Sequence, residues 1–251
     1  MADDNRPLKY MRYAIGEILL VMVGILLALQ VNNWNNERAH RKQEMKYLRS
    51  LKADLQVDLI NLTAFIVDKE VKYTSAFKLL EMGDPQNAFE LNRMDSIIWR
   101  VFGWRTYNPS TNTLDELIGS GNLSIIKNDS IKSMLLNIKQ NNRLVAGGTE
   151  HMRREYDYYL YDRSAALREM MPFVDFEQFI DADTVSFSQK KNDEQLTALK
   201  KQAHAILHDI TFRNGLKLAI LNNRGMRKRC DGLYTNVEHL IELITQELKE
   251  D

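Results

Sequence analysis

Few side chains in this sequence are spaced for chemistry, and the most suggestive pair is His204 and His208 in the stretch HAILH. Residues four apart share one face of a helix, so the two imidazoles can in principle hold a divalent metal ion. The residues between them are Ala205, Ile206 and Leu207, and the glutamate of the zinc-protease motif H-E-x-x-H is therefore missing. The pattern favours two histidines on a partly exposed helix face, and we expect no bound metal.

The other nucleophiles and acid–base groups form no recognisable catalytic set. Cys230 is the single cysteine, which excludes an intramolecular disulfide and a multi-cysteine metal site. It lies among apolar residues at helical spacing, so we interpret it as a small buried hydrophobe. The sequence contains no phosphate-binding glycine loop, nucleophile elbow or metal-protease helix. We therefore expect a protein that is not an enzyme and uses no cofactor.

Glu17 is the one ionisable residue inside the longest apolar stretch, YAIGEILLVMVGILLALQV, from Tyr13 to Val31. A helix of this length spans about 28 Å, close to the hydrocarbon thickness of a bilayer. The stretch predicts a single transmembrane helix, and Trp34 in the asparagine-rich collar behind it is the expected interfacial anchor. The collar lacks a small-residue cleavage site, which favours an uncleaved anchor over a signal peptide.

One face of this helix combines the carboxylate with small residues: Glu17, Val21, Gly24, Ala28 and Val31. Gly24 and Ala28 form a small-xxx-small pair, which lets a second helix approach closely. Three roles for Glu17 stay open: contact with a partner helix, a carboxylate anchored at the interface, and proton or ion handling.

The elements behind the membrane helix are predicted to be helical as well. Apolar residues at helical spacing predict that the membrane helix continues as a rod, with a possible bend at the asparagines, to Met82. These residues are Leu48, Leu51, Leu55, Leu59, Leu62, Ile66, Tyr73, Phe77 and Leu80. A second helix is predicted over 90–104, a third from Ser130 to Met171 with a weak point at Gly147-Gly148, and a loop over 181–192.

The most regular pattern lies in the last segment, 193–248. Its apolar positions alternate four and three residues apart: Phe212, Leu216, Ala219, Asn223, Met226, Cys230, Leu233, Val237, Leu240 and Ile244. This spacing predicts a coiled-coil or bundle seam, on two helices or on one with a break near Gly215. Asn223 either fixes register or oligomeric state as a buried polar residue, or marks a place where the seam is partly exposed.

The irregular stretch 103–128 is where we would look for a partner or ligand patch, because loops on a rigid scaffold often carry function. The candidate residues are Trp104, Tyr107, Asn108, Asn112 and Asp115. The alternative is a cap that closes one end of the bundle. The tyrosine-rich stretch HMRREYDYYLYD (151–162) is interpreted as a packing layer in preference to a binding surface.

These patterns predict an all-α fold in which a single transmembrane helix continues into an elongated helical bundle. We divide the chain into a short tail (1–12), the transmembrane helix with its interfacial collar (13–34), and a helical-bundle domain (35–251) that includes the cap segment 103–128.

Two stretches resemble bacterial domain-of-unknown-function family 6090. They are AIGEILLVMVGILLALQVNNWNNER with the following KYLRSLKADL, and YNPSTNTLDELIGSGNLSIIKNDSIKSML. The resemblance implies a small membrane-anchored bacterial protein with no established activity. It also implies an inner-membrane protein whose helical domain lies outside the cytoplasm. The basic residues that follow the span weakly favour the opposite orientation, with the helical domain in the cytoplasm.

With 34 basic and 34 acidic side chains, the charge is balanced, and we expect no nucleic-acid partner. The expected partners are the lipid bilayer and a protein, either another one or a second copy of this chain, bound through the membrane helix and the bundle. We predict a scaffold or assembly subunit of the envelope that acts through helix–helix contacts. The alternative is a membrane-tethered sensor, which would signal through a membrane partner because only about twelve residues precede the span.

Overall fold

The computed structural model describes residues 6–174 and 191–249, with the backbone alone at residues 6–10, 12 and 13. The described residues are helical or irregular and contain no strand, which confirms the all-α prediction. Residues 1–5 of the predicted tail and 181–190 of the predicted loop lie outside the described residues.

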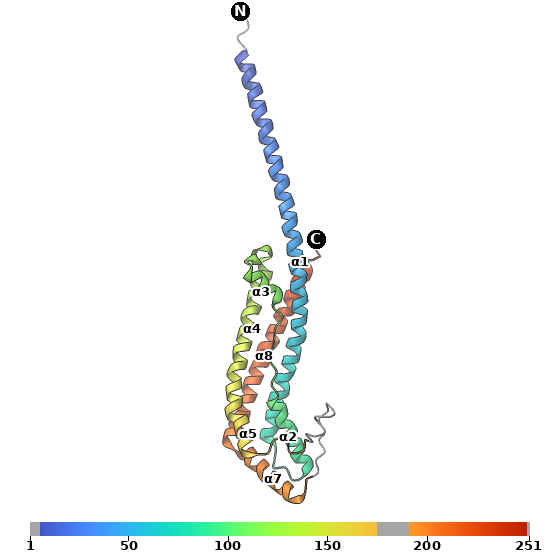
Figure 1. Ribbon diagram of the computed structural model, residues 1–251, viewed down its shortest axis with the longest axis vertical. Coiled ribbons are helices and arrows are strands. Elements are labelled where there is room, and N and C mark those ends of the chain that lie inside the picture. Colours follow the sequence, from blue (N-terminus) through green and yellow to red (C-terminus); the bar gives the residue numbers. More distant parts are fainter. Residues whose placement is uncertain (1–5, 175–190, 250–251) are drawn as a thin grey trace, which may run out of the picture.

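The first helix, α1 (Arg6–Glu81), is 76 residues long and about 114 Å from end to end. It runs without interruption through the collar asparagines and ends one residue before the predicted stop at Met82. Its apolar N-terminal part projects alone from the bundle, and its C-terminal part is one of the bundle's long rods (Figure 1). The predicted membrane helix and the rod are therefore one element.

Three long helices form the bundle: the second half of α1, α4 (Asp129–Glu155) and α8 (Ile210–Glu247). At the end far from the apolar segment lie α2 (Ala88–Phe102), the π-helical turn η2 (Tyr156–Tyr161), α5 (Asp162–Leu167) and α7 (Asp193–His208). At the near end lie α3 (Asn112–Gly119) and the short 3₁₀ turn η1 (Asn122–Ile125), as Figure 1 shows.

All ten predicted seam positions of α8 are buried, so the heptad pattern located this face correctly. The helix does not break at Gly215; the chain turns instead at Asp209, whose side chain accepts a hydrogen bond from the Phe212 N–H. Asp209 thereby caps α8 and separates it from α7. α8 packs against both α1 and α4 and is the central element of the bundle.

The predicted apolar face of α1 is correct only as far as Leu62. Beyond it, the buried residues are Phe65, Lys69, Lys72, Ser75, Ala76 and Leu79. Of the residues that we expected there, Ile66, Tyr73 and Leu80 are half-buried, and Phe77 is 51% exposed. The prediction was wrong because it followed apolar side chains, whereas two lysines occupy the core positions.

The predicted third helix also differs from the observed one. α4 continues unbroken through Gly147-Gly148, and the α-helix gives way to the π turn at Tyr156. The last turn ends at Leu167, before Pro172, because Arg168 takes an extended conformation. The Arg168 guanidinium forms a buried ion pair with Asp95 of α2, and this contact draws the chain away from the helix.

Gly215 allows α8 to approach η2 closely. A Cβ atom at this position would lie 2.7 Å from the Tyr159 Cβ and 2.8 Å from the Leu160 Cδ2. At Gly225, in the same helix, a Cβ would meet nothing within 4 Å. The two glycines thus differ in packing although both lie inside α8.

We predict that Gly215→Ala lowers the free energy of unfolding by about 1–3 kcal/mol, because the methyl group would push α8 off η2. Gly225→Ala is the matched control and should raise the free energy of unfolding by about 0.5–1 kcal/mol, as expected for removing an unconstrained helical glycine. Urea unfolding in detergent, followed by circular dichroism, measures both. Equal effects of the two substitutions would contradict the close packing at Gly215.

Candidate functional site

The first candidate surface is the small-residue face of α1. From Ala14 to His40 each residue of this helix is exposed, and no other described part of the chain covers it. At Gly24 a Cβ atom would have nothing within 4 Å, so the groove beside this residue is open. Glu17, Val21, Gly24, Ala28 and Val31 therefore share a face that is free for an outside partner.

Trp34 lies just beyond this face and is 60% exposed. The Arg38 guanidinium stacks over its indole ring at 5.9 Å from the ring centroid. An indole next to a basic side chain, one turn apart, suits the headgroup region of a bilayer. Its role as an interfacial anchor stays a prediction.

Five residues form a network of hydrogen bonds at the point where α1 enters the bundle. We call it the entry network, and its members are Arg41, Glu44, Lys127, Asn128 and Glu247. The fully buried Glu44 carboxylate accepts hydrogen bonds from the Lys127 backbone N–H at 2.6 Å and from Arg41 at 2.9 Å. Arg41 also reaches Glu247 near the end of α8 at 2.9 Å. Hydrogen bonds from Asn128 and Arg41 lower the pKa of Glu247.

The entry network therefore joins the end of α8 and the start of α4 to α1 at the place where α1 leaves the bundle. Among the residues of α1 whose side chains the structure describes, Glu44 and Met45 are the first buried ones. A carboxylate buried among an arginine and a backbone N–H is stable only while these partners stay in place. These contacts therefore hold α4 and α8 against α1 at this end of the bundle.

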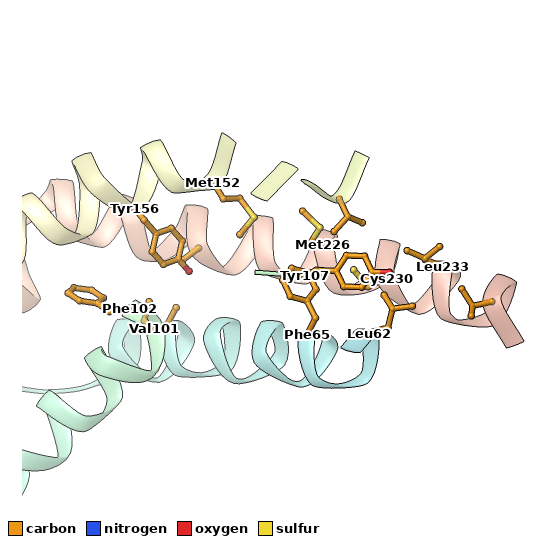
Figure 2. Packing of buried hydrophobic residues seen from close by; sticks show 14 of the residues in the cluster. Leu62, Phe65, Val101, Phe102, Tyr107, Met152, Tyr156, Met226, Cys230 and Leu233 are labelled. Carbon is orange, nitrogen blue, oxygen red and sulfur yellow. The ribbon is translucent and has the colours of Figure 1, made fainter. Parts of the chain in front are cut away.

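Residues 103–111 form an extended strap rather than a cap. The strap runs along α1 from the far end towards the near end, and Tyr107 lies between α1 and α4. The Tyr107 hydroxyl lies 2.8 Å from Asp58 Oδ1 and 3.3 Å from Asn142 Oδ1. Figure 2 shows the Tyr107 ring beside Phe65, with the two centroids 5.7 Å apart. Only the following α3 and η1 close the near end.

The structure spreads the five residues of the predicted patch along the molecule. Trp104 and Tyr107 point into the bundle, and Tyr107 is 7% exposed. Asn108, Asn112 and Asp115 are exposed, and Asp115 binds Thr111 and Lys139. The hydrogen bond from Lys139 and that from Thr111 lower the pKa of Asp115. Ligand binding by the exposed three stays a prediction.

The sequence reading missed a buried polar layer in the middle of the bundle, formed by Asp68, Lys69, Lys72, Tyr156 and Asn223. Both lysine side chains are 1% exposed, and their ammonium groups lie near the partly exposed Asp68 carboxylate, at 3.1 Å for Lys69 and 3.5 Å for Lys72. Aromatic rings cover them: Lys69 Nζ lies 4.2 Å from the Phe65 centroid, and Lys72 Nζ lies 4.8 Å from the Trp104 centroid.

Burial and repulsion between the two lysines weaken their charged forms. Desolvation, followed by the charge of Lys69, lowers the pKa of Lys72 from 10.5 to about 8. Desolvation also lowers the pKa of Lys69. The Asp68 carboxylate thus forms ion pairs with both ammonium groups. Among the described residues, Lys72 Nζ donates no well-formed hydrogen bond.

Across the layer, Asn223 of α8 is fully buried, which excludes the alternative that the seam is exposed there. Its Nδ2 donates to the Tyr156 hydroxyl at 2.8 Å and to the Ala219 carbonyl at 2.7 Å. Burial raises the pKa of Tyr156, so the phenol stays protonated. The amide therefore ties α8 to the π turn; a role in oligomeric state stays a prediction.

Neither Cys230 of the α8 seam nor Lys72 of the layer is mainly in its deprotonated, nucleophilic form at neutral pH. Burial raises the pKa of Cys230 to about 11, which keeps it a thiol at neutral pH. Lys72 remains largely protonated at pH 7 because its pKa is about 8. Its amine has no base at hydrogen-bond distance among the described residues other than Asp68.

One further cluster involves the two histidines singled out from the sequence. The turn after α1 brings Asp84 to α7, where its carboxylate contacts His204 Nδ1 at 2.8 Å and His208 Nε2 at 3.0 Å. Among the described residues this is the group whose atoms can hold a metal ion. The sequence could not reveal Asp84 because it lies about 120 residues away.

Residues 17–166, more than half of the chain, match a family described as a family of unknown function, DUF6090. The chain belongs to DUF6090. The match confirms the family predicted from the two sequence stretches. Comparison with curated proteins and comparison with solved structures give no match.

The DUF6090 match covers α1 from Glu17 onward, the strap, α4 and the π turn. The entry network's Glu44 and the two core lysines thus belong to the family region, whereas α7 and α8 lie beyond it. This DUF6090 protein therefore completes its polar layer with Asn223 from a segment outside the matched region.

For this DUF6090 protein we predict that Lys72→Met raises the free energy of unfolding at pH 7 by about 2–3 kcal/mol. A fall in pKa from 10.5 to about 8 corresponds to about 3 kcal/mol against the charged form in the folded state. Because the unfolded chain binds this proton more tightly, stability should rise between about pH 8 and pH 10.5 in the natural protein.

The variant should lose that rise, which urea unfolding at several pH values measures. Lys78→Met, at an exposed lysine of the same helix, is the control and should leave both the stability at pH 7 and its pH dependence nearly unchanged. A Lys72→Met protein that is less stable at pH 7 would show that the ammonium group is net stabilising.

Proposed function

We propose that this protein is a non-enzymatic, single-pass membrane subunit that assembles through the small-residue face of α1 and orients a helical bundle at the membrane surface. The observation that carries this proposal is the continuity of α1: one helix forms both the apolar, exposed segment and a rod of the bundle. A contact made by the first half therefore fixes the direction of the second.

The apolar segment is suited to a bilayer by length and composition. One described helix is long and apolar enough to cross a membrane, and none of its most apolar window is buried inside the protein. Large apolar side chains point outward on all sides of this segment; Leu20 is 74% exposed and Ile18 is 64% exposed. A soluble fold would cover such side chains. Lipid and a partner helix are the environments that would cover them.

The face around Gly24 supports a partner helix in that bilayer. Lipid tails are as apolar as leucine, so helices associate in membranes through close packing at small residues and through polar contacts. Gly24 and Ala28 permit the close approach, and Glu17 supplies a polar group on the same face. A second copy of this chain is the simplest partner, because it brings the same face.

The polar segment between the span and the bundle holds the bundle away from the lipid. Residues 32–40 are helical and exposed, and they rise about 13 Å. In the proposed arrangement the bundle begins at about this distance from the edge of the hydrocarbon core. We further propose that this bilayer is a bacterial inner membrane and that the bundle lies outside the cytoplasm, and the family resemblance supports this position.

We predict that cysteines on the small-residue face cross-link between copies. In a Cys230→Ser background, Gly24→Cys and Ala28→Cys should give disulfide-linked dimers when isolated membranes are oxidised, several-fold more than Leu26→Cys, which lies on the opposite side of the helix. Non-reducing electrophoresis measures the dimer fraction. The Cys230→Ser protein without an added cysteine controls for dimers that do not depend on the new thiol.

Equal cross-linking at Gly24 and Leu26 would contradict a specific interface between copies. If neither position cross-links, the mass of the complex in mild detergent decides: a larger complex with a different protein supports assembly with that partner. A monomer without any co-purifying protein would overturn the assembly proposal.

The orientation gives a separate prediction. Protease added to intact spheroplasts should digest the bundle, because the proposed position is outside the cytoplasm. Immunoblotting with an antibody against the bundle follows the loss of the full-length band, and a cytoplasmic protein is the control. Protection of the bundle until the membrane is broken would place it inside.

A second candidate function is a membrane-tethered sensor, and the buried polar layer favours it. Lysines in the middle of the interface between α1 and α8 make packing there less favourable than an apolar seam would. In a sensor, a ligand would shift this packing and change the membrane contact. Cross-linking at Gly24 that depends on an added ligand would favour the sensor, whereas constant cross-linking favours the assembly subunit.

A further inference from the structure

We propose that Asp84, His204 and His208 form a binding site for a divalent transition-metal ion, with zinc as the first candidate. The site lies at the end of the bundle far from the apolar segment, where the turn between α1 and α2 meets α7. It shares no residue with the small-residue face of α1 and does not depend on the proposed assembly.

The geometry brings three side chains of types that zinc accepts to one point. The Asp84 carboxylate lies between the two imidazoles, with its Oδ2 2.8 Å from His204 Nδ1 and its Oδ1 3.0 Å from His208 Nε2. The three candidate ligand atoms all lie within 4.8 Å of one another. The two rings stand close, with centroids 4.4 Å apart.

Only small movements would admit the ion. Zinc binds histidine nitrogen and carboxylate oxygen at about 2.0–2.2 Å in a tetrahedral arrangement, so ligand atoms stand about 3.3–3.5 Å apart. The observed contacts are therefore short by about half an ångström. The side chains are 36% exposed at Asp84, 63% at His204 and 60% at His208, which leaves the imidazoles free to rotate outward.

The charges also suit a cation. A hydrogen bond from His204 and another from His208 lower the pKa of Asp84, so the carboxylate is ionised at neutral pH. Neutral imidazoles bind metal through a ring nitrogen lone pair, and the ion would replace the hydrogen bonds that now link the rings to the carboxylate.

Other histidine–carboxylate pairs in the described chain lack this convergence. His151 meets Glu155 four residues on, and His239 meets Glu242 three residues on, each as a single pair within one helix. At Asp84, by contrast, two histidines meet a carboxylate from a different element. A bound ion would tie α7 to the end of α1 and stiffen the far end of the bundle.

Three protein ligands leave one tetrahedral position for water or for a donor group from a partner. Asp84 also lines an open cleft of about 420 Å³ together with Lys78, Glu81, Glu90 and Arg93. This cleft gives an added ligand room beside the ion.

The test uses the full chain in mild detergent, purified with an affinity tag that contains no histidine and stripped of metal with a chelator. Titration with Zn²⁺ by calorimetry should show one equivalent bound, and Co²⁺ should give the visible absorption bands of a low-symmetry site with nitrogen ligands. His204→Ala, His208→Ala and Asp84→Asn should each weaken binding by more than about tenfold. Zn²⁺ should also raise the unfolding temperature of the natural protein.

His151→Ala and His239→Ala are the matched controls, because each removes an exposed histidine beside a carboxylate. They should leave binding of one Zn²⁺ and the Co²⁺ spectrum unchanged. Circular dichroism of the metal-free variants checks that each is folded. Absence of binding to the natural protein, or binding that the three site substitutions do not weaken, would overturn the proposal.

Discussion

The structure depends on one constraint: α1 is a single unbroken helix whose first half is exposed and apolar and whose second half packs in the bundle. Its first half exposes apolar side chains on all faces, as a helix surrounded by lipid does, and its second half buries a single face. Because no glycine or proline interrupts the helix between these halves, no hinge separates the two. The entry network then fixes α8 and α4 to α1 at the point where the helix changes its surroundings, with Glu44 buried between Arg41 and the Lys127 backbone.

The bundle combines a strong apolar seam with a weak polar middle. At both ends of the α8 seam, residues such as Phe212 and Ile244 are fully buried. In the middle, Asn223 faces a region with two lysines, one partly exposed carboxylate and the π turn. Such a layer lowers stability, yet a buried amide bonded to one particular tyrosine allows a single register of α8 against η2. The strap acts similarly between α1 and α4, where Tyr107 joins Asp58 to Asn142.

Sequence patterns predicted the features that follow from local periodicity, such as the buried face of a helix. They did not predict contacts between residues that lie far apart in the sequence. The α8 seam was fully predictable, because its residues alternate four and three apart and are nearly all apolar. On α1 the same spacing runs through Leu62, Phe65, Lys69, Lys72, Ala76 and Leu79, but the two lysines hid it. Following the spacing regardless of polarity would have revealed the core lysines. No local signal could have revealed that Asp84 meets two histidines of α7, or that Arg168 leaves its helix to reach Asp95.

The free energies of burial and of ligand binding favour an assembly subunit over a sensor in which a ligand separates α8 from α1. Seven large apolar residues of the α8 seam are buried, and at about 1.5–3 kcal/mol each they contribute roughly 10–20 kcal/mol. The cost of the charged Lys72 is about 3 kcal/mol and cannot offset this burial. A ligand that binds one state about 10⁴-fold more tightly than the other contributes about 5.5 kcal/mol, which is less than the free energy of this burial. A ligand with that preference can therefore shift the packing of the polar layer but does not offset the burial of the α8 seam. In the proposed assembly subunit the bundle would therefore keep its shape, and a contact at the small-residue face would set the orientation of the bundle through α1.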